Sequence, residues 1–167
     1  DVYKRQIIGS AEAGSTVKLY NGSTLLGSAS ADSNGSFSIT SSTLNEGSYS
    51  LTATATDAAG YTSSSSSALY ITVDTTAPSA PSSLTNTSQG NDTTPTIIGS
   101  AEAGSTVKLY NGSTLLGSAT ADSNGAFSIT SSTLNDGSYS LTATATDAAR
   151  NTSSSSSALS LSLIHIS

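Results

Sequence analysis

The chain has 167 residues, of which 39 are Ser and 25 are Thr, and it carries 5 Lys or Arg against 11 Asp or Glu. A net charge of −6 without a basic cluster argues against nucleic-acid partners and against anionic membranes. No Cys is present, and the only His lies at position 165, so disulfides, thiolate chemistry and an imidazole-based hydrolase site are not expected. We expect no catalytic residues, no enzyme activity and no small-molecule substrate. No apolar run reaches the length of a membrane helix, so membrane insertion is not expected either.

An internal repeat organises the chain. Residues 7–69 match residues 97–159 at an offset of 90, with 58 of 63 positions identical. A unit of this length is a domain in an array, since solenoid turns are shorter. We therefore assign residues 7–74 to a first repeat and residues 75–160 to a second. Residues 74–79, followed by a further Pro at position 81, predict a short and semi-stiff link.

The identity between the repeats stops abruptly at both ends of the chain. The strings DVYKRQ at 1–6 and LSLIHIS at 161–167 resemble translated read-through of a sequencing adapter. We expect both segments to be non-native, the second replacing the close of the last strand, and the chain to be cut from a longer protein. The first repeat then lacks the first strand of its sister. We expect its core to be open along one edge and the first repeat to be the less stable copy.

Strands are the predicted elements, because apolar and hydroxyl side chains alternate with a period of two. Tyr139, Leu141 and Ala143, for example, alternate with Ser and Thr. In chain order, the second repeat is expected to form strands at about 80–86, 95–101, 105–110, 114–121, 126–130, 138–146 and 155–162. Asn111-Gly112 predicts a hairpin with a type I′ turn. Seven short strands separated by turn residues predict an all-β, antiparallel β-sandwich.

Two Ser runs, at 63–67 and 153–157, precede the last strand of each repeat. Their composition favours flexible loop material, and acceptance of O-glycans is the other interpretation.

Three segments carry a resemblance to a known family. They are TPTIIGSAEAGSTV at 94–107, DGSYSLTATATD at 136–147 and VDTTAP at 73–78. Together they resemble the bacterial immunoglobulin-like repeats of very long surface adhesins, including biofilm-associated and RTX-type adhesins. The resemblance implies two tandem immunoglobulin-like antiparallel β-sandwiches of the Greek-key type. Tyr139 falls where a tyrosine corner would lie, and Leu141 takes the position that holds Cys in antibody domains.

The resemblance also implies a structural function. The chain is expected to be a spacer in the stalk of an exported bacterial adhesin, secreted or on the cell surface, and to serve adhesion and biofilm formation. Its partners would be neighbouring repeats of the same chain, and the ligand at the tip would lie outside this fragment. Two alternatives stay open. One is a glycan- or protein-binding immunoglobulin-like module, and the other is an accessory spacer of a secreted polysaccharide-degrading enzyme.

Acidic residues in the loops are the candidate metal ligands. Consecutive antiparallel strands place alternate loops at the same end of a sandwich, so Glu102, Asp122 and Asp147 should share the end where the chain enters from Asp74. Calcium takes six to eight oxygen ligands, which four carboxylates and loop carbonyls could supply. The other interpretation is that Asp and Asn simply make the turns. Because some repeats of the kind that the chain resembles bind calcium at domain junctions, we expect the two interpretations about equally. The matching acids of the first repeat are Glu12, Asp32 and Asp57, but no counterpart of Asp74 precedes them.

Overall fold

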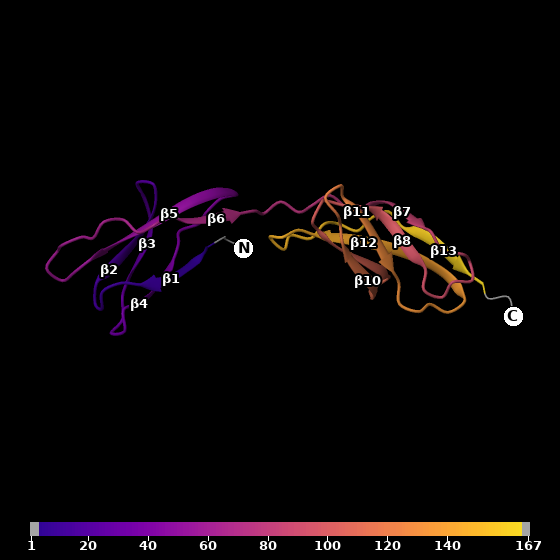
Figure 1. The fold of residues 1–167 in the computed structure, drawn as a ribbon, viewed down its shortest axis with the longest axis horizontal. Coiled ribbons are helices and arrows are strands. Elements are labelled where there is room, and N and C mark those ends of the chain that lie inside the picture. The colour runs from indigo at the N-terminus through magenta and orange to yellow at the C-terminus, as the bar shows by residue number, and fades with distance from the viewer. Residues whose placement is uncertain (1–3, 165–167) are drawn as a thin grey trace. The chain divides into compact units, whose positions relative to one another are not determined.

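The computed structural model describes residues 4–164. Within this range the chain is all-β, and it divides into two compact units, Asp1–Asp74 and Thr75–Ser167, hereafter unit 1 and unit 2 (Figure 1). None of the described residues forms a helix with the length and hydropathy needed to cross a bilayer.

Unit 2 is a sandwich of two antiparallel sheets. One sheet has the order β11-β8-β7 and the other has the order β10-β9-β12-β13. The chain crosses from one sheet to the other after β8, β10 and β11, which gives the predicted Greek-key arrangement. The fourth strand, β10, pairs with β9, whereas in an antibody constant domain the fourth strand joins the sheet of the first. The strands of unit 2 are β7 (Ser82–Asn86), β8 (Thr96–Ser100), β9 (Thr106–Asn111), β10 (Thr114–Thr120), β11 (Ala126–Thr130), β12 (Gly137–Thr146) and β13 (Leu159–Leu163).

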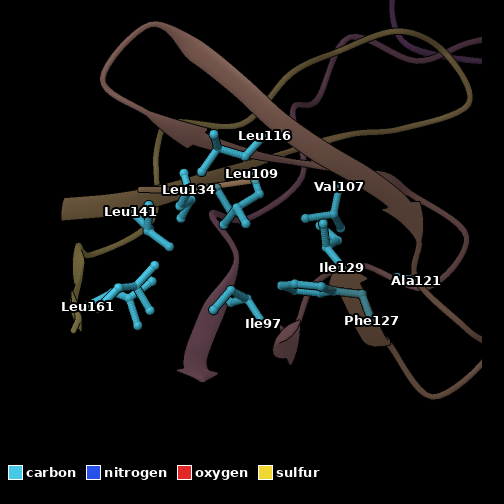
Figure 2. Packing of buried hydrophobic residues seen from close by; sticks show 12 residues of the cluster. Ile97, Val107, Leu109, Leu116, Ala121, Phe127, Ile129, Leu134, Leu141 and Leu161 are labelled. Carbon is cyan, nitrogen blue, oxygen red and sulfur yellow. The ribbon is translucent and has the colours of Figure 1, made fainter. Parts of the chain in front are cut away.

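The period-two pattern places the apolar face of each strand in the core of unit 2. In β12, Leu141, Ala143 and Ala145 are fully buried, and the Thr residues between them are half-buried. Figure 2 shows side chains from both sheets, among them Leu109 and Ile97, pointing into the space between the sheets. With neither Cys nor Trp in this core, the two layers are joined by aliphatic packing around Phe127.

The hairpin between β9 and β10 lies at its predicted position, but its turn differs from the prediction. Asn111 pairs with Thr114, so the two central residues are Gly112 and Ser113. Only Gly112, at φ 57, adopts a positive φ there. A type II′ turn has positive φ at its first central residue alone, whereas type I′ needs it at both. The predicted I′ turn is therefore wrong, because Asn111 ends its strand and stays outside the loop.

The Ser run at 153–157 is an ordered part of the sandwich, so its interpretation as flexible loop material is wrong. Ser153 and Ser156 are buried, and each forms two hydrogen bonds to β12. The backbone N–H of Ala145 donates to Ser153 Oγ at 2.9 Å, and that of Ala143 donates to Ser156 Oγ at 2.9 Å. The N–H groups of the two serines donate back to the same alanines. This pairing delays the last strand, which begins at Leu159 and not near residue 155.

The tyrosine corner is present in both units. The hydroxyl of Tyr139 donates to the carbonyl of Asn135 at 2.8 Å, and that of Tyr49 donates to the carbonyl of Asn45 at 2.9 Å. Each bond spans four residues and closes the corner that leads into the longest strand of its unit. The predicted role of Tyr139 is therefore confirmed.

We expect Tyr139→Phe to lower the free energy of unfolding of unit 2 by about 1 kcal/mol, because the change removes one hydrogen bond and keeps the ring. Thermal unfolding of the full chain, followed by circular dichroism, measures the loss. Tyr49→Phe is the matched variant and should lower only the transition of unit 1. Two variants that melt like the parent would show that the hydroxyls add no stability.

Unit 1 repeats this architecture with six strands among the described residues. One sheet has the order β3-β2-β5-β6, and the other consists of β1 and β4 alone. The counterpart of β7 would fall, at the offset of 90, before residue 1. The strands are β1 (Gln6–Ser10), β2 (Thr16–Asn21), β3 (Thr24–Ser30), β4 (Ser36–Thr40), β5 (Gly47–Thr56) and β6 (Leu69–Val73).

Candidate functional site

Three of the four predicted metal ligands lie at one end of unit 2. Glu102 lies between β8 and β9, Asp122 lies between β10 and β11, and Asp147 directly follows β12. The pairing of Ser100 with Ala126, and of Thr106 with both Thr120 and Thr146, places these loops at the same end. The chain also enters unit 2 at this end, because Ser82, the first residue of β7, pairs with Ser100. Within unit 2, the loops that bear Glu102, Asp122 and Asp147 therefore lie at one end, as expected.

Asp122 organises its own turn. Its Oδ1 accepts hydrogen bonds from the backbone N–H groups of Asn124 at 2.8 Å and of Ala126 at 2.9 Å. Gly125 completes the turn at φ 81, where an added Cβ would lie 2.5 Å from the carbonyl oxygen of Ala101. Asp32 makes the same two bonds in unit 1. The carboxylate therefore has a turn-forming role in both copies.

Asp147 holds the loop after β12 through both of its oxygens. Oδ1 accepts from the backbone N–H of Asn151 at 2.8 Å, and Oδ2 accepts from Asn151 Nδ2 at 2.8 Å. Desolvation raises the pKa of Asp147, but hydrogen bonds from Asn151 and from the backbone of Ala149 and Arg150 outweigh it and lower the pKa below 3.8. The ionised form is thus favoured by folding. Its stabilisation is present above the ordinary pKa and is lost as the pH falls through the lower folded-state value.

The remaining predicted ligands differ in their surroundings. The main-chain carbonyl of Glu102 accepts from Ser105 N at 3.1 Å and from Ser105 Oγ at 2.7 Å, which fixes the loop. Asp74 is the last residue of unit 1 and is half-buried. Between residues 4 and 164, no three acidic or His side chains gather in one group suited to a metal ion. The calcium site thus stays a prediction, and two of its carboxylates, those of Asp122 and Asp147, already serve turns.

A second candidate site lies in unit 1 and is apolar. A groove of about 750 Å³ opens between β1 and the segment that follows β5, and it is lined by Ile7, Phe37, Ala53 and Leu69 among others. The predicted open edge of the first repeat indicated this place. Two of its lining residues, Glu12 and Asp57, are the acids that match Glu102 and Asp147, and its apolar residues were not singled out as a site.

The sequence profile of the bacterial Ig-like domain matches residues 2–75 and 79–163, which covers both units. The chain belongs to the bacterial Ig-like domain family. It therefore consists of two Ig-like domains in tandem, as the repeat predicted. No curated protein matches the chain.

Solved structures resemble these bacterial Ig-like domains at low sequence identity. The BSP domain of a biofilm-associated protein is 25% identical, with a TM-score of 0.43; the match covers 97% of this chain and 28% of that one. The fibronectin(III)-like modules of Clostridium thermocellum CbhA are 18% identical, with a TM-score of 0.56. This match covers 97% of this chain and 86% of that one. The D00-D0 domain of intimin is 15% identical, with a TM-score of 0.36. This match covers 99% of this chain and 94% of that one. The chain spans little more than a quarter of the first of these structures. The CbhA modules support the fold.

Proposed function

We propose that the two Ig-like domains are spacer repeats in the stalk of an exported bacterial surface adhesin. The observation that carries the proposal is the path of the chain through unit 2. The chain enters beside Ser100, at the end of the acidic loops, and β13 ends where Leu163 pairs with Gly137, at the opposite end. A domain with entry and exit at opposite ends can be joined head to tail in a row, so each copy adds to the reach of the chain.

The length of that reach follows from the longest strand. β12 has ten residues, and at about 3.3 Å per residue it spans roughly 33 Å. The near-identity of the two repeats supports the same function, because a spacer gains length by duplication without a new binding surface. Adhesion and biofilm formation would then depend on a domain at the tip, and the location would be the bacterial surface.

Calcium at the domain junction is the finer part of the proposal. Three acidic loops share the end at which the chain enters unit 2, and Asp74 is the residue just before unit 2 begins. A bound ion would stiffen the stalk in extracellular calcium. Sites of this kind bind calcium with dissociation constants of about 0.1–1 mM.

The test is thermal unfolding of the full chain in 1–5 mM calcium and in chelator, together with X-ray scattering. We expect calcium to raise the melting temperature by several degrees and to lengthen the particle. Asp74→Ala combined with Asp147→Ala should abolish the response. Asp57→Ala removes the equivalent loop carboxylate of unit 1 and serves as the matched control, which should keep it.

Two results would contradict the calcium site. A double variant that responds to calcium like the parent would show that the ligands are wrong. A parent that does not respond would show that these acids are turn residues and that the stalk is a spacer without metal. The stalk function itself is tested separately, by the presence of many such repeats between a membrane anchor and a tip domain in the complete reading frame.

A further inference from the structure

The four-stranded sheet of unit 1 turns one face away from the core, hereafter the outer face. Side chains alternate between the two faces of a strand, so the residues between the buried positions of β2, β3, β5 and β6 point outward. Most of these outward side chains are those of Ser and Thr. The others are Lys18, Tyr20, Leu25 and Tyr70. The outer face is therefore polar, with two aromatic rings set among hydroxyl groups.

The two tyrosines lie on either side of β5. Tyr70, in β6, is opposite Ser50 and is 78% exposed, and Tyr20, in β2, is opposite Thr52 and is half-buried. The spacing of strands and the rise along them put the two tyrosine Cα atoms about 12 Å apart. Tyr joins an apolar ring to a polar hydroxyl, which makes it a frequent residue of binding surfaces. Both rings are thus open to a ligand that lies across β5.

Charge also distinguishes the outer face from the rest of unit 1. Lys18 is the only charged residue among the outward side chains of the four strands, and it is exposed. It lies two residues from Tyr20 on the same strand, with about 7 Å between their Cα atoms. The acidic residues between positions 4 and 74 all lie outside the strands, and they are Glu12, Asp32, Glu46, Asp57 and Asp74. The outer face is therefore a positive surface on an acidic chain, and it suits a ligand with negative charge.

We propose that the outer face of unit 1 binds an acidic polysaccharide. Tyr20 and Tyr70 each receive the C–H groups of a sugar ring, which pack against the negative face of an aromatic ring. The hydroxyls of Ser50 and Thr52 lie between them and exchange hydrogen bonds with those of the sugar. Lys18 pairs with a carboxylate of the chain. The separation of the tyrosines is close to the length of one disaccharide, so one extended polysaccharide chain covers both.

The composition of the outer face favours a polysaccharide over a protein partner. The buried centre of a protein interface is apolar, and Leu25 is the only aliphatic residue among the outward side chains described here. Unit 2 has Lys108 and Tyr110 at the equivalent positions, but Ser160 stands where unit 1 has Tyr70. We therefore expect the stronger site in unit 1. This inference goes beyond the stalk function and does not rest on it.

The experiment is calorimetric titration of the full chain with a hexasaccharide of β-1,4-linked mannuronate. We expect one site with a dissociation constant of about 0.1–1 mM. The hexasaccharide of β-1,4-linked mannose is the matched ligand, because it has the same linkage and no carboxylate. It should bind about two- to fivefold more weakly, and added salt should reduce this difference. Both titrations are made in chelator, so they are independent of the calcium site.

Variants of exposed residues locate the site without disturbing the core. Tyr70→Ala should weaken binding of both sugars at least about fivefold, whereas Tyr70→Phe should keep it, because the ring makes the contact. Tyr61→Ala is the matched control and should change nothing, since Tyr61 is 77% exposed but lies in the loop after β5. Lys18→Gln should weaken binding of the mannuronate alone, by about two- to fivefold. Ser160→Tyr should add a second site in unit 2.

The proposal is wrong if the parent chain binds neither hexasaccharide. It is also wrong if Tyr70→Ala and Tyr61→Ala have equal effects, or if Ser160→Tyr leaves the number of sites at one. Equal affinity for the two sugars would remove the acidic polysaccharide as the ligand. Self-association of the chain that Tyr70→Ala abolishes, measured by light scattering without sugar, would assign the outer face to a second copy. Each of these results leaves the stalk function untouched.

Discussion

Unit 1 should unfold at a temperature about 10–20 °C below that of unit 2, although the two have nearly the same sequence. The core of unit 2 contains twelve buried apolar residues and that of unit 1 contains seven. Fully burying a large apolar side chain contributes about 1.5–3 kcal/mol, so partial exposure at several positions amounts to a few kcal/mol. For a domain of this size each kcal/mol changes the melting temperature by about 4–8 °C. Scanning calorimetry of the full chain should resolve two transitions.

Matched core variants assign the two transitions. Leu51 and Leu141 are equivalent, and each is buried to within 1% of full burial. Leu51→Ala should lower only the first transition and Leu141→Ala only the second, each by about 2–5 kcal/mol. Limited proteolysis should cut unit 1 first. Equal resistance of the two units, or one transition that both variants lower together, would show that the open edge of unit 1 does not determine its stability.

The sequence predicted most of the sandwich because its signals are local. Alternation along 137–146 identified β12 and the inward faces of Leu141 and Ala143, and Gly112 marked the hairpin. All seven predicted strands of the second repeat are present, and they begin or end within a few residues of the expected positions. The tyrosine corner was also predictable, because its position relative to the strand is fixed by the fold.

Features that depend on distant partners were not predictable in the same way. Ser153 belongs to a low-complexity run, and its hydrogen bonds to Ala145, eight residues earlier, fix its place in the sandwich. Ser63 forms the same bonds to Ala55 and is exposed, so the burial of Ser153 depends on more distant parts of unit 2. The turn type depends on which residue ends β9. The clearest case is Ala53 against Ala143, where the same residue in the same local sequence is partly buried in unit 1 and fully buried in unit 2, so its burial depends on parts of the chain outside that local sequence. For the acidic loops, the sequence predicted a shared end and left metal binding and turn formation open as two interpretations. Asp122 and Asp147 direct their oxygens to their own turns, as the second interpretation expected.

Ala143→Leu and Ala53→Leu should change stability in opposite directions, although they are the same substitution at equivalent positions. Ala143 is fully buried among the core side chains of unit 2, so a larger side chain forces neighbours apart. Overpacking of this kind costs about 1–3 kcal/mol. Ala53 lines the open groove of unit 1, where added methyl and methylene groups find space and cover exposed apolar surface. Filling such a space commonly adds about 0.5–2 kcal/mol.

The measurement is again calorimetry of the full chain, in which Ala143→Leu should lower the second transition and Ala53→Leu should raise the first. The decisive result is whether Ala53→Leu raises or lowers the first transition, because this depends only on whether the groove is open in solution. If Ala53→Leu destabilises unit 1 as Ala143→Leu destabilises unit 2, the sheets of unit 1 have closed on each other. If the signs differ, unit 1 keeps the space that β7 fills in unit 2.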